Sequence, residues 1–419
     1  MTTENRDPST GPEDALGGSL RHYRPFAFYW LSRVFSTIAL QMQNVAIGWQ
    51  MYDLTHNPLD LGLVGLVHFL AAACLVLVAG HVADRYDRRI VVRICQFVAG
   101  LAAATLAAGT AMGWLTREAI LGIVLVIGAT RTFEQTTQQT LLPTVVPLSL
   151  LARATAASAS ATQVAVIAGP ALGGLIYAVS PVAVYALCAA LYLTASVIVG
   201  LIKIERSAPS REPLSAAVLF AGFGYILHNR RILGAISLDL FAVVLGGCYA
   251  LLPVFAKDVL GGTSWDLGLL RASPGVGALI SAVVLTHWPP RRAVGRIVFG
   301  AVAAYGIGIL VFALSHSLAL SMAAMMLLGG ADMVSVVIRM TLIQLETPDE
   351  MRGRVSAVNS LFVIASNQLG EFRAGLVAAW LGAVPAVLIG GVGALVVVLL
   401  SVKLFSELYR VDTMETPRR

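Results

Sequence analysis

Four carboxylates lie inside long apolar runs of this 419-residue chain, where an unpaired charge is costly. They are Glu134, Asp239, Asp332 and Glu371. A low-dielectric environment favours the neutral form of a carboxyl group, so such a group can take up and release a proton near neutral pH. We therefore interpret all four as candidate proton carriers. The alternative for each is a static ion pair that holds helices together.

Basic and amide side chains share these apolar runs. Arg131 lies three residues before Glu134, so the two share a helix face and can pair. Asp332 is followed in its run by Arg339, and the first apolar run carries Arg33. The polar face of that first run also includes Gln41, Gln43 and Asn44. Because an ionisable group in an apolar span must face a partner or a water-filled cavity, these residues indicate a polar interior.

The composition indicates that the apolar runs are membrane spans. Hydrophobic residues make up 57% of the chain and charged residues 12%, about half the charged share of an ordinary soluble domain. A helix that crosses a hydrocarbon core of about 30 Å needs roughly 20 apolar residues, which leaves room for about twelve spans. We expect an all-α, multi-pass protein of the inner or plasma membrane, surrounded by the lipid bilayer.

Hydropathy places the twelve helices in two groups of six. The expected helices cover about residues 26–52, 61–82, 90–114, 119–142, 154–179, 182–202, 233–255, 267–286, 297–314, 318–345, 355–381 and 384–404. The longest polar interval, residues 203–231, is expected to be a cytoplasmic linker between a first bundle at 23–202 and a second at 232–406. Residues 1–22 and 407–419 are expected to be cytoplasmic tails, the first a disordered segment and not a cleaved signal peptide.

A short charged loop indicates the orientation. Residues 80–89 read Gly-His-Val-Ala-Asp-Arg-Tyr-Asp-Arg-Arg, with two acids and three arginines between two apolar runs. Arginine-rich short loops stay on the cytoplasmic side, so this loop and both termini are expected there. The net charge of +6 lies mainly in such loops, which favours a topology signal over nucleic-acid binding.

The two halves of the chain resemble each other. Asp60-Leu-Gly-Leu63 opens one expected helix and Asp266-Leu-Gly-Leu269 opens another, at an offset of 206 residues. A second match, at an offset of 201, pairs residues 147–175 with 348–376 and Gly174 with Gly375. That offset also places Asp332 opposite Arg131. Apolar helices can match by chance, but polar and glycine landmarks in register favour a true repeat of six helices, hence two pseudo-symmetric bundles.

The charged loop also resembles a family signature. Its residues Gly80, Ala83, Asp84, Arg85, Arg88 and Arg89 match the loop between the second and third helices of major facilitator superfamily transporters. Val82 and Asp87 depart from that pattern, where Leu and Gly are usual. The Asp-Arg-x-Asp-Arg-Arg form, together with Gly-Glu-Phe at 370–372, is similar to the branch that contains the enterobactin exporter and the macrolide efflux pumps. A charge cluster that only signals topology is the alternative.

The fifth expected helix carries a second family-like motif. Gly169, Pro170, Gly173 and Gly174 resemble the Gly-Pro-x-x-Gly-Gly core found in superfamily members that export by antiport. The upstream glycines of the full motif are absent, with Ala156 and Ala165 at those spacings. An ordinary small-residue packing face is the alternative.

The resemblance implies a role for each group of residues. In the superfamily, helices 1, 4, 7 and 10 line a central cavity. Arg33, Gln41, Asn44, Arg131 and Arg339 thereby become candidates for substrate contact, and Glu134, Asp239, Asp332 and Glu371 for proton coupling. The family packs helix 2 against helix 11, which suggests a contact between His68 and Glu371. The loop residues Gly80, Asp84, Arg85, Arg88 and Arg89 are expected to form a gate, with Asp84 meeting the start of helix 11.

We therefore expect a secondary active transporter that exports an amphipathic small molecule, such as a siderophore or drug, by proton antiport. An uptake transporter or an uncoupled facilitator of the same fold is the alternative. A receptor or an enzyme would call for a soluble domain, metal-ligand spacing or a nucleophile constellation, and the sequence has none of these. The expected partners are the substrate, protons and lipid, with no cofactor and no metal, and the expected state is a monomer.

Overall fold

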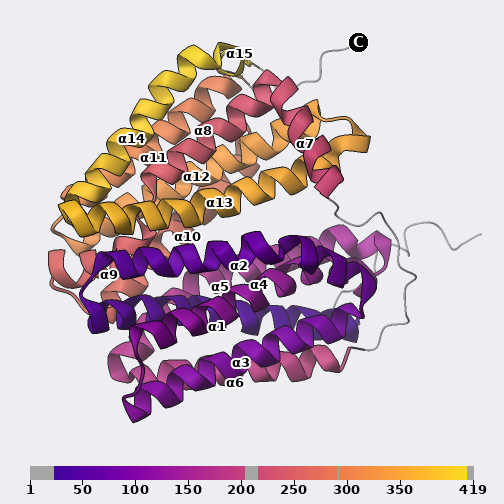
Figure 1. Ribbon diagram of the computed structural model, residues 1–419. Helices are drawn as coiled ribbons and strands as arrows, with labels where there is room; N and C mark the ends of the chain where they lie inside the picture. Colours follow the sequence, from indigo (N-terminus) through magenta and orange to yellow (C-terminus); the bar gives the residue numbers. More distant parts are fainter. Residues whose placement is uncertain (1–22, 203–215, 291, 413–419) are drawn as a thin grey trace, which may run out of the picture.

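The apolar runs of the sequence form long helices that lie side by side in two groups (Figure 1). The computed structural model describes residues 23–202, 216–290 and 292–412, except for the side chains of Asp84, Leu148 and residues 216–220. The described residues contain helices and connecting turns but no strand. This confirms the all-α prediction.

The first group consists of six long helices. They are α1 (Arg24–Thr55), α2 (Pro58–Arg85), α3 (Arg88–Met112), α4 (Arg117–Val145), α5 (Leu151–Val179) and α6 (Pro181–Gly200), with a 3₁₀ turn η3 (Leu148–Leu150) before α5. Polar residues start several of them: Asn57 caps α2 at Leu59 N (3.0 Å), and Thr116 caps α4 at Ala119 N (3.3 Å). Each cap satisfies a backbone N–H that the helix itself leaves free.

The second group begins with α8 (Arg230–Gly246), which is followed by three short turns, η4 (Tyr249–Leu251), α9 (Leu252–Val254) and η5 (Phe255–Val259). Then come α10 (Ser264–His287), α11 (Val294–Leu314), α12 (Leu318–Glu346), α13 (Asp349–Leu381), α14 (Ala383–Leu404) and α15 (Ser406–Tyr409). The expected helix at 233–255 is thus interrupted after Gly246. At the interruption Gly247 lies against the backbone of Gly370, where a Cβ would have no room.

The interval predicted as a polar linker contains a further helix. Residues 203–215 lie outside the described residues, but Ala216–His228 forms the apolar helix α7. It packs on the start of α13, with Gly222 against the Arg354 carbonyl, and the Tyr225 hydroxyl donates to the Glu346 carbonyl (2.8 Å). Hydropathy alone did not separate this helix from its charged neighbours.

Nine helical segments of the described residues are long and apolar enough to cross a membrane. The long helices α1, α4 and α13 are not among these nine; they have 32, 29 and 33 residues and carry Arg33, Glu134 and Glu371. A length of about 20 residues suffices to span, so these three would complete the predicted set of twelve. The full count stays a prediction.

The two groups pack along two helix pairs, α2 with α13 and α5 with α10 (Figure 1). Gly62 of α2 meets Gly375 of α13: a Cβ on Gly375 would lie 2.7 Å from the Gly62 Cα. Gly174 of α5 meets Gly268 of α10 in the same way, at 2.9 Å. The offset of 206 residues relates Gly62 to Gly268, and the offset of 201 relates Gly174 to Gly375. Both contacts between the bundles thus use repeat-related glycines. The match confirms the two pseudo-symmetric bundles.

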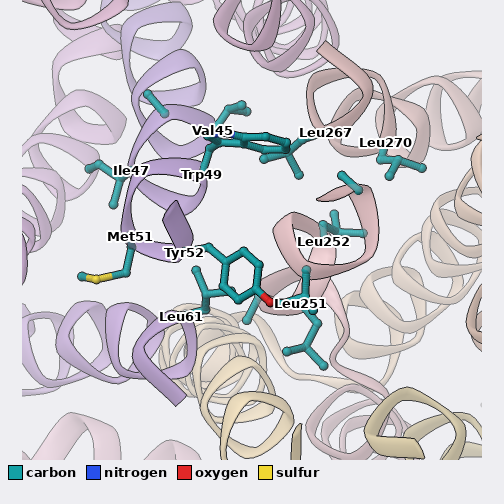
Figure 2. Packing of buried hydrophobic residues seen from close by; sticks show 14 of the residues in the cluster. Val45, Ile47, Trp49, Met51, Tyr52, Leu61, Leu251, Leu252, Leu267 and Leu270 are labelled. Atoms are coloured by element: carbon teal, nitrogen blue, oxygen red, sulfur yellow. The ribbon is translucent and has the colours of Figure 1, made fainter. Parts of the chain in front are cut away.

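A shared hydrophobic cluster joins the bundles toward one end. One hydrophobic cluster contains residues of both bundles, whereas the other three clusters each stay within one bundle. The joint cluster lies at the end that carries Thr55, Val179 and Val259, which we call the far end. Figure 2 shows α1 there facing the second bundle. We call the following group the seal cluster: Val45, Trp49, Tyr52, Leu61, Leu251, Leu252, Leu267 and Leu270.

Ionic contacts reinforce the joint at the far end. Lys257 forms an ion pair with Asp53 and lies over the Trp49 ring, with Nζ 6.0 Å from the ring centroid. The Tyr52 hydroxyl donates to Asp258. At the opposite end, which carries α7 and the connection between the bundles and is called the linker end, the described residues show no hydrogen bond or ion pair between the bundles.

Candidate functional site

Three helices of the first bundle bring polar side chains to Glu134. Gln96 of α3 and Gln138 of α4 each donate from Nε2 to its carboxylate at 2.8 Å. The Gln96 amide also bonds Ser32 of α1 at 3.0 Å. Glu134 is therefore stabilised by neutral amides. The predicted pairing with Arg131 is not among the ion pairs of the described residues.

The other polar residues of α1 lie near this cluster or pack against α5. Arg33 donates to the Tyr29 hydroxyl at 2.8 Å, and that hydroxyl donates to the Gln138 carbonyl at 3.3 Å. Gln41 packs on α5, because a Cβ on Gly169 would lie 2.6 Å from the Gln41 Cβ. Asn44 is partly buried on the same helix. Sequence reasoning placed these residues at a cavity, and the structure gives Arg33 a protein partner instead.

The second bundle holds an ion pair in the equivalent place. Asp239 of α8 and Arg339 of α12 form an ion pair, and both side chains are buried. The offset of 206 relates Asp239 to Arg33, and the offset of 201 relates Arg339 to Gln138. The two bundles thus keep polar side chains at equivalent positions of α1 with α4 and of α8 with α12. Among the described residues, only the second pair of helices has an ion pair at these positions.

Asp332 lies beside this ion pair, inside the second bundle. It lines a small cavity of about 10 Å³, comparable to the space that one water molecule needs. The other lining residues are Asp239, Ala242, Val243, Val302, Tyr305, Ala331 and Ser335, all from the second bundle. The prediction that Asp332 faces Arg131 is therefore wrong, because the repeat relates positions within bundles and does not bring them together.

Glu371 lies where the two bundles meet. It sits on α13 against Gly65 of α2, where an added Cβ would come within 3.1 Å of its Oε2. Its carboxylate interacts electrostatically with Arg131 of α4 and with Arg271 of α10. The charges near this carboxylate thus include one arginine from each bundle.

His68 does not contact Glu371. Its Nδ1 lies 3.1 Å from the place of a Cβ on Gly128, so the ring faces α4, and Arg131 lies nearby. No hydrogen bond or ion pair among the described residues joins His68 to Glu371. The structure thus gives His68 a neighbour on α4 in place of the predicted hydrogen-bonding or ionic contact with Glu371.

Arg271 is the central residue that sequence reasoning missed. It interrupts an apolar run in α10 and approaches α1, with Nη2 3.5 Å from the place of a Cβ on Gly48. The rule that identified Arg131 applies equally to Arg271, since a guanidinium in a span needs a partner or water. Arg373 of α13 is partly buried and donates to the Gly247 carbonyl at 3.4 Å.

The charged loop makes its contacts within the first bundle. Asp87 caps α3, with Oδ1 3.0 Å from Arg89 N. Hydrogen bonds from the Arg89 side chain lower the pKa of Asp87 below its ordinary value of 3.8. Arg88 donates to the carbonyls of Ala83 (3.4 Å) and Thr140 (3.3 Å), and Arg89 to that of Ile202 (2.7 Å).

The remaining loop residues leave the gate untested. Gly80 is buried within α2 and Arg85 is exposed, while the Asp84 side chain lies outside the described residues. The described loop side chains hold α2, α3, α4 and α6 together and do not reach α13. The predicted gate, in which Asp84 meets the start of α13, stays a prediction for a different conformation.

The glycines of the α5 motif face two different partners. Gly169 and Gly173 pack on α1, at Gln41 and Met42. Gly174 and the Pro170 carbonyl face Gly268 of α10, so the motif ends at the contact between the bundles. Within the described residues, no group of three or more His, Cys, Asp or Glu side chains could hold a metal ion.

A family model described as "transmembrane secretion effector" matches residues 19–417. The chain belongs to this family, a branch of the major facilitator superfamily. Curated relatives of the chain include the enterobactin exporters EntS of Citrobacter koseri and Salmonella choleraesuis. They are 25% and 24% identical to it over 398 residues, which cover 93% of the chain and 94% of each relative.

Solved structures show the same fold for this family member. The nucleoside transporter NupG has a TM-score of 0.74 at 14% identity, covering 91% of the chain and all of NupG. A bacterial homologue of the iron transporter ferroportin, in an inward-facing state, has a TM-score of 0.69 at 19% identity over 94% of the chain and all of the homologue. The family and these neighbours indicate a multi-pass membrane transporter rather than an enzyme.

Proposed function

We propose that this transporter exports an amphipathic small molecule, such as a siderophore or drug, in exchange for protons. Two observations support export: the curated relatives are named as enterobactin exporters, and the Gly-Pro-x-x-Gly-Gly motif of α5 ends at the contact between the bundles. The amphipathic substrate is supported by arginine, glutamine and tyrosine side chains, including Arg33, Gln96 and Tyr29, among otherwise apolar helices.

We further infer that the protein lies in the cell membrane with its linker end in the cytoplasm. The arginines of residues 85–89 and Arg230, Arg231 and Arg352 lie at that end, as the positive-inside rule requires. The far end then faces outward, and the seal cluster closes the centre from the outside. The proposed state is inward-facing and can receive substrate from the cytoplasm.

The place of Glu371 at the contact between the bundles, with one arginine of each bundle among the charges near it, supports the coupling proposal. An ionised Glu371 attracts an arginine of each bundle and favours the arrangement in which all three groups are close. A protonated Glu371 loses most of that attraction. Protonation of Glu371 therefore raises the free energy of this arrangement relative to one in which the three groups are far apart. Coupling requires such a difference.

The test is transport in reconstituted proteoliposomes under an imposed pH gradient, with enterobactin and a small panel of drugs as substrates. We expect gradient-driven transport of at least one compound and a loss of about tenfold or more in Glu371→Gln. Glu134→Gln, Asp239→Asn and Asp332→Asn test the other candidates. Glu118→Gln is the matched control, since that carboxylate is exposed at the far end.

Each contrary result has a distinct meaning. Transport that ignores the gradient would identify an uncoupled facilitator, and accumulation in the opposite direction an uptake system. If all four neutral variants retain gradient-driven export, the assignment of coupling to these carboxylates is wrong.

A further inference from the structure

The centre of the molecule carries more positive than negative charge. Arg33, Arg131 and Arg271 interact with only two carboxylates, Glu134 and Glu371. The neighbouring acid Asp239 is already paired with Arg339. With Arg339, Arg373 and Asp332 included, five arginines stand against four carboxylates, and neither Arg131 nor Arg271 is in an ion pair among the described residues.

Arg271 is the arginine with the fewest protein partners. Among the described residues, no hydrogen bond or ion pair reaches its guanidinium, and its buried Nε has no partner. A guanidinium has five N–H donors, and a buried donor without an acceptor is costly. Arg373, by comparison, donates to a backbone carbonyl.

Arg131 faces the same region from the first bundle. Its side chain is exposed although it lies in the middle of α4, and Glu371 of the other bundle is among the charges near it. No hydrogen bond or ion pair among the described residues occupies its guanidinium either. Two arginine side chains without a hydrogen bond or ion pair among the described residues, one from each bundle, thus have Glu371 among the charges near them.

We propose that Arg271 and Arg131 bind an anionic group of the substrate, a carboxylate, acidic phenolate or phosphate, between the two bundles. Arginine holds such groups with paired, charge-assisted hydrogen bonds. A bound anion would supply a counter-charge to both arginines.

This inference rests on the proposed function, since it names the chemical class of the exported substrate. Its test measures binding without any gradient, so it is independent of coupling and direction. Purified protein in lipid-free detergent is titrated with three fluorescent probes of similar shape: dansylglycine, an anion; dansylamide, which is neutral; and dansylcadaverine, a cation.

We expect dansylglycine to bind about tenfold more tightly than dansylamide, and dansylcadaverine most weakly. Arg271→Gln and Arg131→Gln should each remove most of the preference for the anion, whereas Arg271→Lys should keep part of it. Arg230→Gln, at an exposed residue of the linker end, should behave like the unsubstituted protein.

Equal binding of the three probes, or an unchanged preference in both glutamine variants, would overturn the proposal. Should Arg271→Gln aggregate on size exclusion, the probe series and Arg131→Gln decide the question. Displacement of dansylglycine by added phosphatidylglycerol would assign the arginines to a lipid headgroup and overturn the substrate assignment. Absence of gradient-driven transport beside intact anion binding would refute the coupling proposal alone.

Discussion

Glu134, Asp239 and Glu371 all lie in long helices, yet each has different partners. Two glutamine amides surround Glu134, a buried arginine pairs with Asp239, and two more distant arginines are among the charges near Glu371. A carboxylate with a close, buried counter-charge is held in one state, whereas one with distant and shared counter-charges can change its protonation at lower cost. This contrast makes Glu371 the strongest candidate for coupling and favours a structural role for Asp239.

The buried pair of Asp239 and Arg339 predicts a non-additive effect on stability. Asp239→Asn leaves the Arg339 charge buried and uncompensated, which we expect to cost about 3–5 kcal/mol. The double variant Asp239→Asn with Arg339→Gln removes both charges and should recover much of that loss. Thermal unfolding of the detergent-purified variants measures the difference. A double variant as unstable as the sum of the singles would contradict the pairing.

Helices of the two bundles meet through glycines at equivalent positions of the repeat. Gly62 with Gly375, and Gly174 with Gly268, let the backbones of α2 and α13, and of α5 and α10, approach closely. No side chain at these positions can move aside, because the nearest atoms are backbone. The close approach of the bundles at the far end therefore depends on four glycines, which have no Cβ atom.

Alanine at these glycines should push the bundles apart. In Gly375→Ala the new Cβ would lie 2.7 Å from the Gly62 Cα, which we expect to cost about 1–3 kcal/mol and to reduce transport. Gly122→Ala and Gly300→Ala are matched controls, since no atom lies within 4 Å of their Cβ positions. These controls should be neutral or slightly stabilising, because alanine favours the helix. Transport and thermal unfolding are the measurements; Gly375→Ala behaving like the controls would refute the close contact.

The cap of α3 gives a prediction for low pH. Asp87→Ala removes the cap and should cost about 1 kcal/mol, while Asp87→Asn keeps a capping oxygen and should cost less. Because Arg89 lowers the Asp87 pKa in the folded protein, the stabilising charge is fully present above the ordinary pKa of 3.8. It is lost as the pH falls through the lowered value.

The stability difference between the unsubstituted protein and Asp87→Asn should therefore shrink below about pH 4. Melting temperatures over a pH series measure it. A constant difference over the whole series would mean that the Asp87 charge contributes nothing.

The two bundles are in contact from the far end to the middle of α5 and α10, where Gln163 donates to the Gly275 carbonyl at 2.9 Å. At the linker end, the described residues show no hydrogen bond or ion pair between the bundles. The seal cluster excludes water at the far end (Figure 2). Two polar contacts at its edge join α1 to η5: the ion pair of Asp53 with Lys257 and the hydrogen bond from the Tyr52 hydroxyl to Asp258. The Asp53 and Lys257 side chains are about one-third exposed, so solvent screens the pair. Apolar contacts therefore contribute most of the free energy that keeps the far end closed, and the ion pair adds a small part.

Breaking the ion pair should open the far end modestly. We expect Lys257→Gln to raise the population of open molecules by up to about fivefold, equivalent to about 1 kcal/mol. A reporter cysteine, Leu252→Cys in a chain with Cys74→Ser, measures this as faster labelling by a maleimide added outside. Leu252 is fully buried in the seal, and Cys74 is the exposed cysteine to be removed.

Arg117→Gln provides the control for that experiment. It breaks the pair of Arg117 with Asp60, which lies at the same end but within one bundle. Equal labelling of the Lys257→Gln and Arg117→Gln variants would contradict the role of Lys257 between the bundles.

Much of the architecture was determined by the sequence alone. Apolar runs of about 20 residues must span, charged loops must stay outside the lipid, and the aligned glycines Gly62, Gly174, Gly268 and Gly375 mark equivalent contacts. These properties depend on residues close together in the chain or on a register that repeats within it. They could therefore be predicted before any coordinates were known.

The partners of the buried charges were decided only by the tertiary structure. The spacing along a helix tells which residues share a face, but not toward which neighbouring helix that face is turned. His68 turns to α4 and not to α13, Asp332 stays inside its own bundle, and Arg271 joins Glu371 from another helix. The rotation and tilt of packed helices set these contacts, because they depend on the side chains of both partners at once.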